Sequence, residues 1–426
     1  MISSAEKTAS EETVNYRKKK IAFLTATMPA LTETFILREY NYLAKSKLIE
    51  VYPFAIRRPA KYCMNYEYQH LVTHIFYMRP DHLGSIFWSN IVMLFAHPVK
   101  YLKALKVLFR CSGVKFKIWT RYIFHFLCGA YLARYLPAHG FHAIHAHFDS
   151  AGNIALFANL IGDIEFTITF HASDDLYYGM KPLLRFKLEK AKAVITESKY
   201  NVSFINLLTF YKYENKITCV YNSMDTKIFK NSNEKQSIKL PARFLSIGSF
   251  VSFKGYHTVI KALGILKQKN IPFIYRIIGD GNEEEKSMII SLAEQYRITD
   301  SVELLGAQSF SEVLKQLEWC DIEIMNSETA EGGLRDGFPT VIAEAMLAKR
   351  PVVSTYVSDI PNVIKHGETG YLIPEHNPEA LADILYTLVT NYEQTIPVVR
   401  NAYQFAVKHF DININGPKLE RILLGK

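Results

Sequence analysis

Two carboxylates flank a predicted helix start in the stretch Asp336-Gly-Phe-Pro-Thr-Val-Ile-Ala-Glu344, with seven residues between them. Gly337 lets a ligand approach the backbone closely, and Pro339 suits the first turn of a helix. The free amides around 337–340 would form an anion site. An anion site between two carboxylates predicts a pocket for a phosphate beside sugar hydroxyls. An N-capping aspartate with a surface glutamate is the alternative, because such caps are common.

A lysine stands in a second loop of the same half of the chain. The stretch Gly248-Ser-Phe-Val-Ser-Phe-Lys254-Gly follows an apolar run that predicts a strand. A lysine at the opening of the next helix can neutralise a diphosphate as a point charge. A solvated lysine in a turn is the alternative. Gly279, in Gly-Asp-Gly after another apolar run, predicts a tight turn at a strand end, a signal that many strand–helix turns give.

Histidines end two apolar runs in the first half of the chain. His171 opens His-Ala-Ser-Asp174, where an imidazole can donate a hydrogen bond to a substrate hydroxyl or accept a proton. A structural histidine is equally compatible with this position. His145 and His147 alternate, so they share one face of a strand. The sequence offers this pair no third metal ligand at useful spacing. We therefore expect no metal, and we expect one of the two to line a cleft.

The elements that must position these residues alternate between strands and helices. Helical patterns such as 257–270 and 311–319 lie between short apolar runs. This alternation predicts βαβ units and parallel sheets, with ligand sites at the carboxyl ends of the strands. The predicted strands are 21–27, 50–56, 73–78, 143–148, 166–171, 193–198, 217–222, 243–249, 273–280, 302–307, 322–327 and 351–355.

This series of strands is too long for one sheet, and it pauses at a polar segment near 227–240. We predict an α/β protein with two doubly wound, Rossmann-like parallel-sheet domains that face each other across a cleft. The predicted parts are a disordered tail over 1–18, a first domain over 19–235, a second domain over 236–400, and a C-terminal helix over 401–426 that packs back toward the first domain.

Positive charge is concentrated in one window. Residues 82–148 contain no Asp or Glu but eight Lys and Arg, against a net charge of +9 for the chain. Lys100, Lys103 and Lys106 recur among apolar residues, as in a basic amphipathic helix on anionic lipid; a core-packing helix with solvated lysines is the alternative. The apolar centre, 86–96, is about half the ~20 residues of a membrane span. We expect an interfacial or buried helix, and no nucleic-acid partner, since no binding motif accompanies the charge.

Several function classes are disfavoured. The five cysteines form no CxxC pair, which argues against a zinc ribbon, an iron–sulfur site or a disulfide-stapled secreted domain. The polar N-terminus lacks a secretory signal, so we expect a cytoplasmic location. The first predicted strand is followed by no GxGxxG, which argues against a nicotinamide-dependent oxidoreductase.

In this order, these stretches resemble the family-four retaining glycosyltransferases of GT-B fold, which use nucleotide-sugars. The resemblance runs over nearly the whole chain and is most specific in DGFPTVIAEAMLAKRPVVST, residues 336–355. The stretch PALTETFILREYNYL, residues 29–43, is similar to the subgroup that builds bacterial exopolysaccharide and lipopolysaccharide.

The resemblance implies roles for the residues above. Lys254 would bind the donor diphosphate, Asp336 the hydroxyls of the donor sugar, and Glu344 the nucleotide ribose. His171, Lys254 and Asp336 would be catalytic. The donor site would comprise Gly248, Ser249, Lys254, Gly279, Asp336, Gly337, Phe338, Pro339, Thr340 and Glu344, and the acceptor side would comprise Thr32, Glu33, His147, His171 and Asp174.

The chain departs from the family pattern at two of these positions. The family usually has Arg where Ser249 stands, which removes one of two expected cations; Arg335 is a candidate replacement. The first glutamate of the family's pair is Asp336 here. The resemblance implies a UDP- or GDP-linked donor, a lipid-linked or oligosaccharide acceptor, retention, no metal or other cofactor, and a location on the inner face of the cytoplasmic membrane. An inactive nucleotide-sugar-binding partner of a transferase complex is the alternative.

Overall fold

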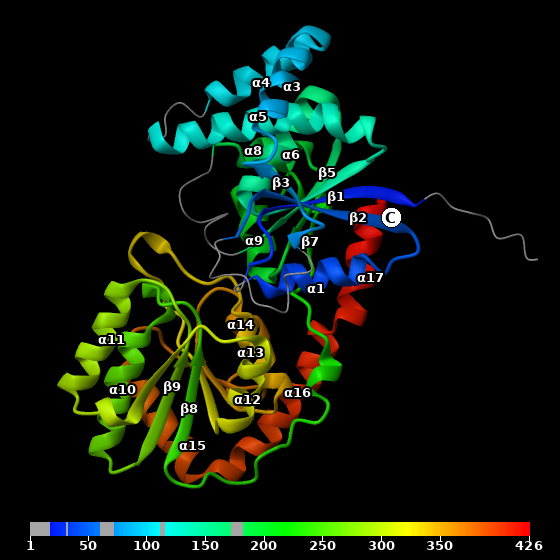
Figure 1. The fold of residues 1–426 in the computed structure, drawn as a ribbon. Helices are drawn as coiled ribbons and strands as arrows, with labels where there is room; N and C mark the ends of the chain where they lie inside the picture. Colours follow the sequence, from blue (N-terminus) through cyan, green and yellow to red (C-terminus); the bar gives the residue numbers. More distant parts are fainter. Residues whose placement is uncertain (1–17, 31–32, 60–71, 111–115, 172–181) are drawn as a thin grey trace, which may run out of the picture.

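A computed structural model describes residues 18–30, 33–59, 72–110, 116–171 and 182–426 of the chain. Two parallel sheets dominate it, and helices lie against both of them (Figure 1). Thr32 and Asp174 lie outside the described residues.

The first sheet has seven strands in the order β3-β2-β1-β4-β5-β6-β7. Its chain order reverses direction between two neighbours, β1 (Lys19–Thr27) and β4 (Ala143–His147), and such a switch point is where ligands of doubly wound sheets bind. The strand interiors are almost wholly buried, as expected when helices cover both faces. The other strands are β2 (Ile49–Arg57), β3 (Phe76–Arg79), β5 (Glu165–Phe170), β6 (Ala193–Thr196) and β7 (Ile217–Cys219).

One face of the first sheet is covered by α1 (Thr34–Leu43) together with the last helix of the chain, α17 (Ile412–Leu424). Leu419 and Leu423 of α17 share a buried cluster with Ile21 and Phe23 of β1. The end of the chain therefore packs on the first domain. The remaining helices of this domain are α3 (Leu83–Ala96), α4 (Pro98–Phe109), α5 (Phe116–Ala138), α6 (Phe148–Gly162), α8 (Leu184–Lys190) and α9 (Lys199–Leu208).

The second sheet has six strands in the order β10-β9-β8-β11-β12-β13, with its switch point between β8 (Ala242–Ile247) and β11 (Ile322–Met325). This is the strand order of dinucleotide-binding Rossmann folds. The other strands are β9 (Phe273–Ile278), β10 (Val302–Gly306), β12 (Val352–Thr355) and β13 (Tyr371–Ile373), and the helices are α10 (Tyr256–Gln268), α11 (Glu283–Gln295), α12 (Phe310–Trp319), α13 (Thr340–Leu347), α14 (Ile360–Val363), α15 (Pro378–Thr390) and α16 (Thr395–Phe410).

The structure differs from the predicted elements in two places. The sequence analysis missed β13, which has three residues and pairs only with β12. It also expected one helix over 401–426, whereas α16 ends at Phe410 and α17 begins at Ile412. The break is stabilised by Asp411, whose carboxylate caps α17 by accepting a hydrogen bond from the Asn413 backbone.

The helices α3 and α4 and the start of α5 stand at the end of the molecule opposite the second domain (Figure 1). The predicted apolar segment near 82–99 does not form one helix: α3 ends at Ala96, and α4 begins at Pro98. Within the described ranges, no helix combines the length and the apolar character that crossing a bilayer requires.

Candidate functional site

Lys254 and Asp336 meet at the switch point of the second sheet. Lys254 ends the short helix η5 (Ser252–Lys254) after β8, and Asp336 lies in the loop after β11. The Lys254 Nζ is 3.0 Å from Asp336 Oδ1, and the Ser327 hydroxyl donates to Asp336 Oδ2 at 2.7 Å. The lysine and aspartate side chains are 12% and 14% exposed. A fixed cation and a fixed carboxylate therefore lie side by side, and each keeps some exposure to solvent.

Glycines shape the loop that carries Lys254. A Cβ on Gly279 would lie 1.9 Å from the Gly248 carbonyl oxygen, so only glycine lets these two strand ends touch. Gly255 has φ +63°, in the left-handed region that glycine adopts without strain. The Tyr256 hydroxyl donates to the Gly248 carbonyl at 2.7 Å. The structure thus gives Gly248 and Gly279 a packing role. Ser249, which directly follows Gly248, is partly buried.

Helix α13 begins at Thr340, four residues after Asp336. Pro339 is the residue before the helix rather than a member of its first turn, which corrects the sequence expectation. The Phe338 ring is 6% exposed and stacks on Phe410 at a centroid distance of 5.3 Å, so its side chain belongs to the core and only its backbone can meet a ligand. The Gly337 carbonyl accepts from the Asp359 backbone amide at 3.2 Å. Thr340, the first residue of α13, is partly exposed.

Glu344 on α13 is paired with the first domain. Its Oε1 accepts from Arg38 Nη2 of α1 at 3.1 Å, and the Arg38 guanidinium lies 4.8 Å from the centroid of the Phe310 ring. The side chains of Arg38 and Glu344 are 18% and 9% exposed. The sequence analysis missed Arg38. In this structure the carboxylate that was expected to bind ribose thus forms an ion pair between the domains.

Arg335 also reaches the first domain. It donates to the Tyr200 hydroxyl at 2.8 Å, and its guanidinium lies 5.4 Å from the centroid of the same ring. The Tyr200 backbone amide in turn donates to Asp359 of the second domain at 2.8 Å. These contacts give Arg335 a place at the domain boundary, and nothing in them supports its expected replacement of the missing cation at Ser249.

The candidate histidines lie at the strand ends of the first sheet, but they are buried. His147 Nδ1 is 3.0 Å from His171 Nε2, and their rings are nearly parallel. Phe35 and Phe148 lie against the His171 ring at centroid distances of 4.8 and 4.7 Å. His145 and His147 are 0% exposed and His171 is 3% exposed. The expectation that one of the strand histidines lines a cleft is therefore wrong, because aromatic rings close over the strand ends.

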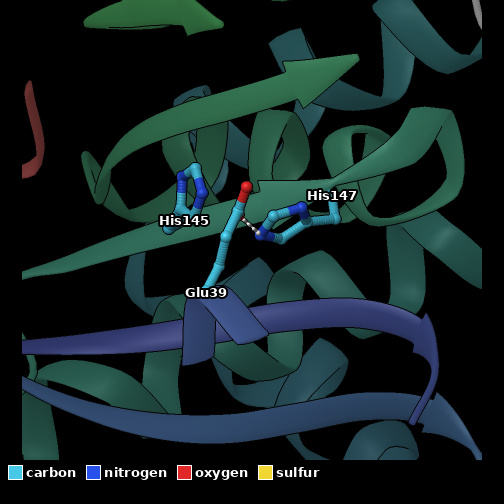
Figure 2. A group of neighbouring side chains, drawn as sticks. All are labelled: Glu39, His145 and His147. Carbon is cyan, nitrogen blue, oxygen red and sulfur yellow. Dashed lines mark ion pairs between the residues drawn. The ribbon is translucent and has the colours of Figure 1, made fainter. Parts of the chain in front are cut away.

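A third group accompanies the histidine pair, contrary to the sequence expectation. Glu39 projects from α1 toward His145 and His147 (Figure 2), and its Oε2 lies 3.8 Å from His147 Nε2. Burial raises the pKa of Glu39 to about 8 and lowers the pKa of His145 to about 3. The sequence does carry a signal for this: Ile36, Glu39 and Leu43 follow one helical face, so a carboxylate stands in an apolar stripe.

Glu33, the remaining described acceptor-side candidate, directly precedes α1 at the same edge of the first sheet and is partly exposed. A further titratable cluster lies in the second domain, where Glu328 is 3.3 Å from His257 Nε2 and 3.0 Å from His376 Nδ1. The Glu328 amide donates to the Phe253 carbonyl beside Lys254. Sequence reasoning missed this cluster because its members follow three different strands.

Residues 227–405 match the family model described as "Glycosyl transferases group 1". The putative colanic acid biosynthesis glycosyltransferase WcaL of Escherichia coli K12 is 32% identical over 184 residues, covering 43% of this chain and 45% of that protein. The amylovoran biosynthesis glycosyltransferase AmsK of Erwinia amylovora is 34% identical over 193 residues, covering 45% and 47%. The chain thus spans about half the length of these curated relatives.

Solved structures share the whole architecture. Anabaena Alr3699/HepE in complex with UDP superposes with a TM-score of 0.67 at 17% identity, over 96% of this chain and 100% of that one. Sucrose-phosphate synthase from Thermosynechococcus elongatus superposes with a TM-score of 0.66 at 14% identity, over 95% and 98%. The chain therefore has the GT-B fold of two parallel-sheet domains, and its residues 227–405 are similar to the glycosyl transferases group 1 family.

Proposed function

We propose that the chain is a retaining glycosyltransferase that moves a sugar from a UDP- or GDP-linked donor to a lipid-linked or oligosaccharide acceptor in the synthesis of a bacterial cell-surface polysaccharide. The observation that carries the proposal is the Lys254–Asp336 pair at the switch point of the second sheet, inside the region that matches the family model. WcaL and AmsK are named as glycosyltransferases of colanic acid and amylovoran biosynthesis, which supports the polysaccharide context.

The chemistry follows from where charge develops. As the bond between sugar and phosphate breaks, the diphosphate gains negative charge and the sugar gains oxocarbenium character. Fixed positive groups near the leaving oxygens lower this barrier. In the proposal, Lys254 and the amides at the start of α13 supply that charge, while Asp336 accepts hydrogen bonds from sugar hydroxyls. We expect full transfer without added magnesium or manganese, because these groups act where a divalent cation otherwise would.

The acceptor side is assigned to the strand ends of the first sheet. Burial lowers the pKa of His171 to about 3, so its imidazole is neutral at pH 7 and offers hydrogen bonds without a charge. Because Phe35 and Phe148 cover its ring, the proposed role of His171 is to support the acceptor side from beneath, through its contact with His147, rather than to touch the acceptor. Glu33 lies at the same edge of the sheet. Thr32 and Asp174 stay predictions for this side.

Peripheral attachment to an anionic membrane is part of the same proposal. Apolar side chains on α3, α4 and α5 are exposed, with Phe87 at 69%, Phe95 at 79% and Phe116 at 76%. Lys103 and Lys106 are exposed beside them. A basic surface that also presents large apolar side chains is suited to an anionic leaflet. This end of the molecule lies opposite the second domain (Figure 1), which leaves the donor site free.

One lysine of the predicted membrane helix and one aromatic residue of the same basic window have other contacts. Lys100 forms an ion pair with Asp163, so it is less available than the other lysines of α4. The Trp119 side chain is partly buried, packs against the core of the first domain and lies beside Phe109 and Phe116. The basic part of the proposed membrane surface therefore consists of Lys103 and Lys106, beside the exposed apolar residues of α3, α4 and α5.

A donor-binding panel tests the assignment of the donor site. Each nucleotide-sugar is added to the full chain and thermal unfolding is followed; a ligand at 100 times its dissociation constant adds about 2.7 kcal/mol. We expect one UDP- or GDP-sugar to stabilise the wild type and the control Lys239→Ala, and to have much less effect on Lys254→Ala. Stabilisation of Lys254→Ala equal to the wild type would show that the phosphate assignment is wrong. Donor binding without any transfer would favour the inactive binding partner.

Sedimentation with anionic vesicles tests the membrane part. The double variant Lys103→Glu/Lys106→Glu should lose most of its vesicle binding, because each basic residue near an anionic surface contributes roughly 1 kcal/mol. The control Lys230→Glu/Lys239→Glu makes the same charge change at exposed lysines elsewhere. Equal loss in both variants would indicate a non-specific charge effect, and no loss in either would exclude docking through α4.

A further inference from the structure

The cluster of Glu39, His145 and His147 has the composition of a metal site. His145 and His147 project from the same face of β4, and α1 lays Glu39 across that face (Figure 2). Each residue offers one ligand atom, and these atoms all lie within 4.8 Å of one another. Two histidines and one glutamate are a ligand set of zinc sites in enzymes.

The polar atoms at the centre of the cluster lack partners. Glu39 Oε2 and His147 Nε2 are both buried and make no hydrogen bond in the described structure. They are 3.8 Å apart, which is too long for a hydrogen bond. Buried polar atoms are nearly always satisfied. Zinc lies about 2.0–2.2 Å from its nitrogen and oxygen ligands, so two ligands of a tetrahedral ion are roughly 3.4 Å apart. The 3.8 Å between Glu39 Oε2 and His147 Nε2 is close to that value, and all three ligand atoms lie within 4.8 Å of one another.

The Nδ1 atom of each of the two imidazole rings contacts another side chain. His145 Nδ1 lies 2.8 Å from the Thr167 hydroxyl, and His147 Nδ1 lies 3.0 Å from His171 Nε2. A hydrogen bond at the second nitrogen of a metal-binding histidine fixes the orientation of the ring, most often through a carboxylate, a backbone carbonyl or water; here a hydroxyl and a second imidazole take that place. In His147 this contact turns Nε2 toward Glu39.

Charge balance points the same way. Among the residues that the structure describes, no lysine or arginine is paired with Glu39; Arg38, its neighbour, pairs with Glu344 instead. An uncompensated buried carboxylate is costly, so the group must be protonated or must face a cation. A divalent ion would neutralise the carboxylate and satisfy the free imidazole nitrogen in the same step.

We propose that Glu39, His145 and His147 bind one divalent transition-metal ion, with zinc as the expected ion, and that this ion fastens α1 to the first sheet. The inference does not depend on the proposed transfer reaction. Because α1 also carries Arg38 to Glu344, the ion would stiffen the element that joins the two domains.

The metal content of the full chain, prepared without a polyhistidine tag, is the primary measurement. After incubation with equimolar zinc and dialysis, we expect about one ion per chain and a lower unfolding temperature after prolonged chelation. A wild-type chain that retains no zinc and whose unfolding temperature does not respond to zinc overturns the proposal, whatever the variants do.

Glu39→Gln separates the two ways of satisfying the site, because glutamine mimics a protonated carboxyl but is a poor metal ligand. We expect its zinc affinity to fall at least tenfold. Replacing a residue that only hydrogen-bonds to a metal ligand already lowers metal affinity about 10- to 100-fold, and Glu39 is proposed to be a ligand itself. The control His376→Gln, in the second histidine cluster, should keep the zinc. A Glu39→Gln chain with wild-type zinc content, or loss of zinc only in His376→Gln, contradicts the proposal. If Glu39→Gln does not fold, His147→Gln takes its place in the same comparison.

Discussion

The two sheets place polar residues at equivalent strand ends, yet the two sites treat charge differently. In the second domain, Lys254 and Asp336 are 3.0 Å apart and stay partly open to solvent. In the first domain, Glu39 and the histidines of β4 are almost wholly buried, and burial shifts their pKa values toward the neutral forms. The same topology thus yields a partly exposed pair of opposite charges and a dry cluster whose groups stay neutral unless a cation binds them. Water access, rather than strand order, separates the two.

Replacing Asp149 with alanine should have the largest effect on stability. Asp149 is 8% exposed and pairs with Lys187, which is 0% exposed. Removing one partner of such a pair leaves a buried charge and costs about 3–5 kcal/mol. Urea unfolding of the full chain measures this cost. The control Glu312→Ala breaks a solvent-screened pair with Lys315 and should cost much less. Equal losses in the two variants would contradict the contrast between dry and solvated charges.

The buried His125 predicts a loss of stability in acid. Burial lowers its pKa to about 4, against 6.5 for an ordinary histidine. Between these values the unfolded chain binds a proton that the folded chain does not, so stability is complete above pH 6.5 and falls as the pH drops toward 4. The total loss is about 3 kcal/mol, at roughly 1.4 kcal/mol per pH unit. His125→Asn should reduce the slope of unfolding free energy against pH by the contribution of one proton, while the other buried histidines keep the rest of the slope; the exposed His139→Gln should leave the slope unchanged. An unchanged slope in His125→Asn argues against this assignment.

Arg38→Ala should have a smaller effect, at the boundary between the domains. Arg38 occupies the Glu344 carboxylate that the proposed donor would need for its ribose. A partly exposed ion pair contributes about 1 kcal/mol, so removing the arginine should raise donor affinity up to about fivefold. Calorimetric titration with the donor found by the panel measures this change. A fall in affinity as large as that of Glu344→Ala would mean that the pair holds Glu344 in its binding position.

Much of the fold could be predicted from the sequence because each buried parallel strand is a short, continuous apolar run of residues. Each predicted apolar run overlaps a strand, from β1 to β12, although the ends differ, as at β3 (Phe76–Arg79 against the predicted 73–78). The short β13 escaped because three residues, Tyr371 to Ile373, are too few to show a period. The break between α16 and α17 escaped because a capping Asp411 inside an amphipathic pattern resembles an ordinary polar position.

The candidate site could be predicted only where its residues are close in the sequence. Asp336 and Glu344 stand in one stretch, and the lysine loop has its own pattern, so the switch point of the second sheet was visible. The contacts of Glu39 and Arg38 depend on how α1 packs between distant elements. No local spacing encodes that packing. The burial of His147 likewise depends on rings contributed by other segments.

In the proposed reaction, Lys254 stabilises the charge of a departing nucleotide diphosphate. The most direct test is the rate at which the full chain releases UDP or GDP from the preferred donor in the presence of an acceptor. We predict that Lys254→Ala lowers this rate about 100-fold or more, as expected for the loss of one charge-stabilising contact, while Lys239→Ala keeps the wild-type rate. A Lys254→Ala chain that turns over at the wild-type rate would show that Lys254 does not stabilise the departing diphosphate.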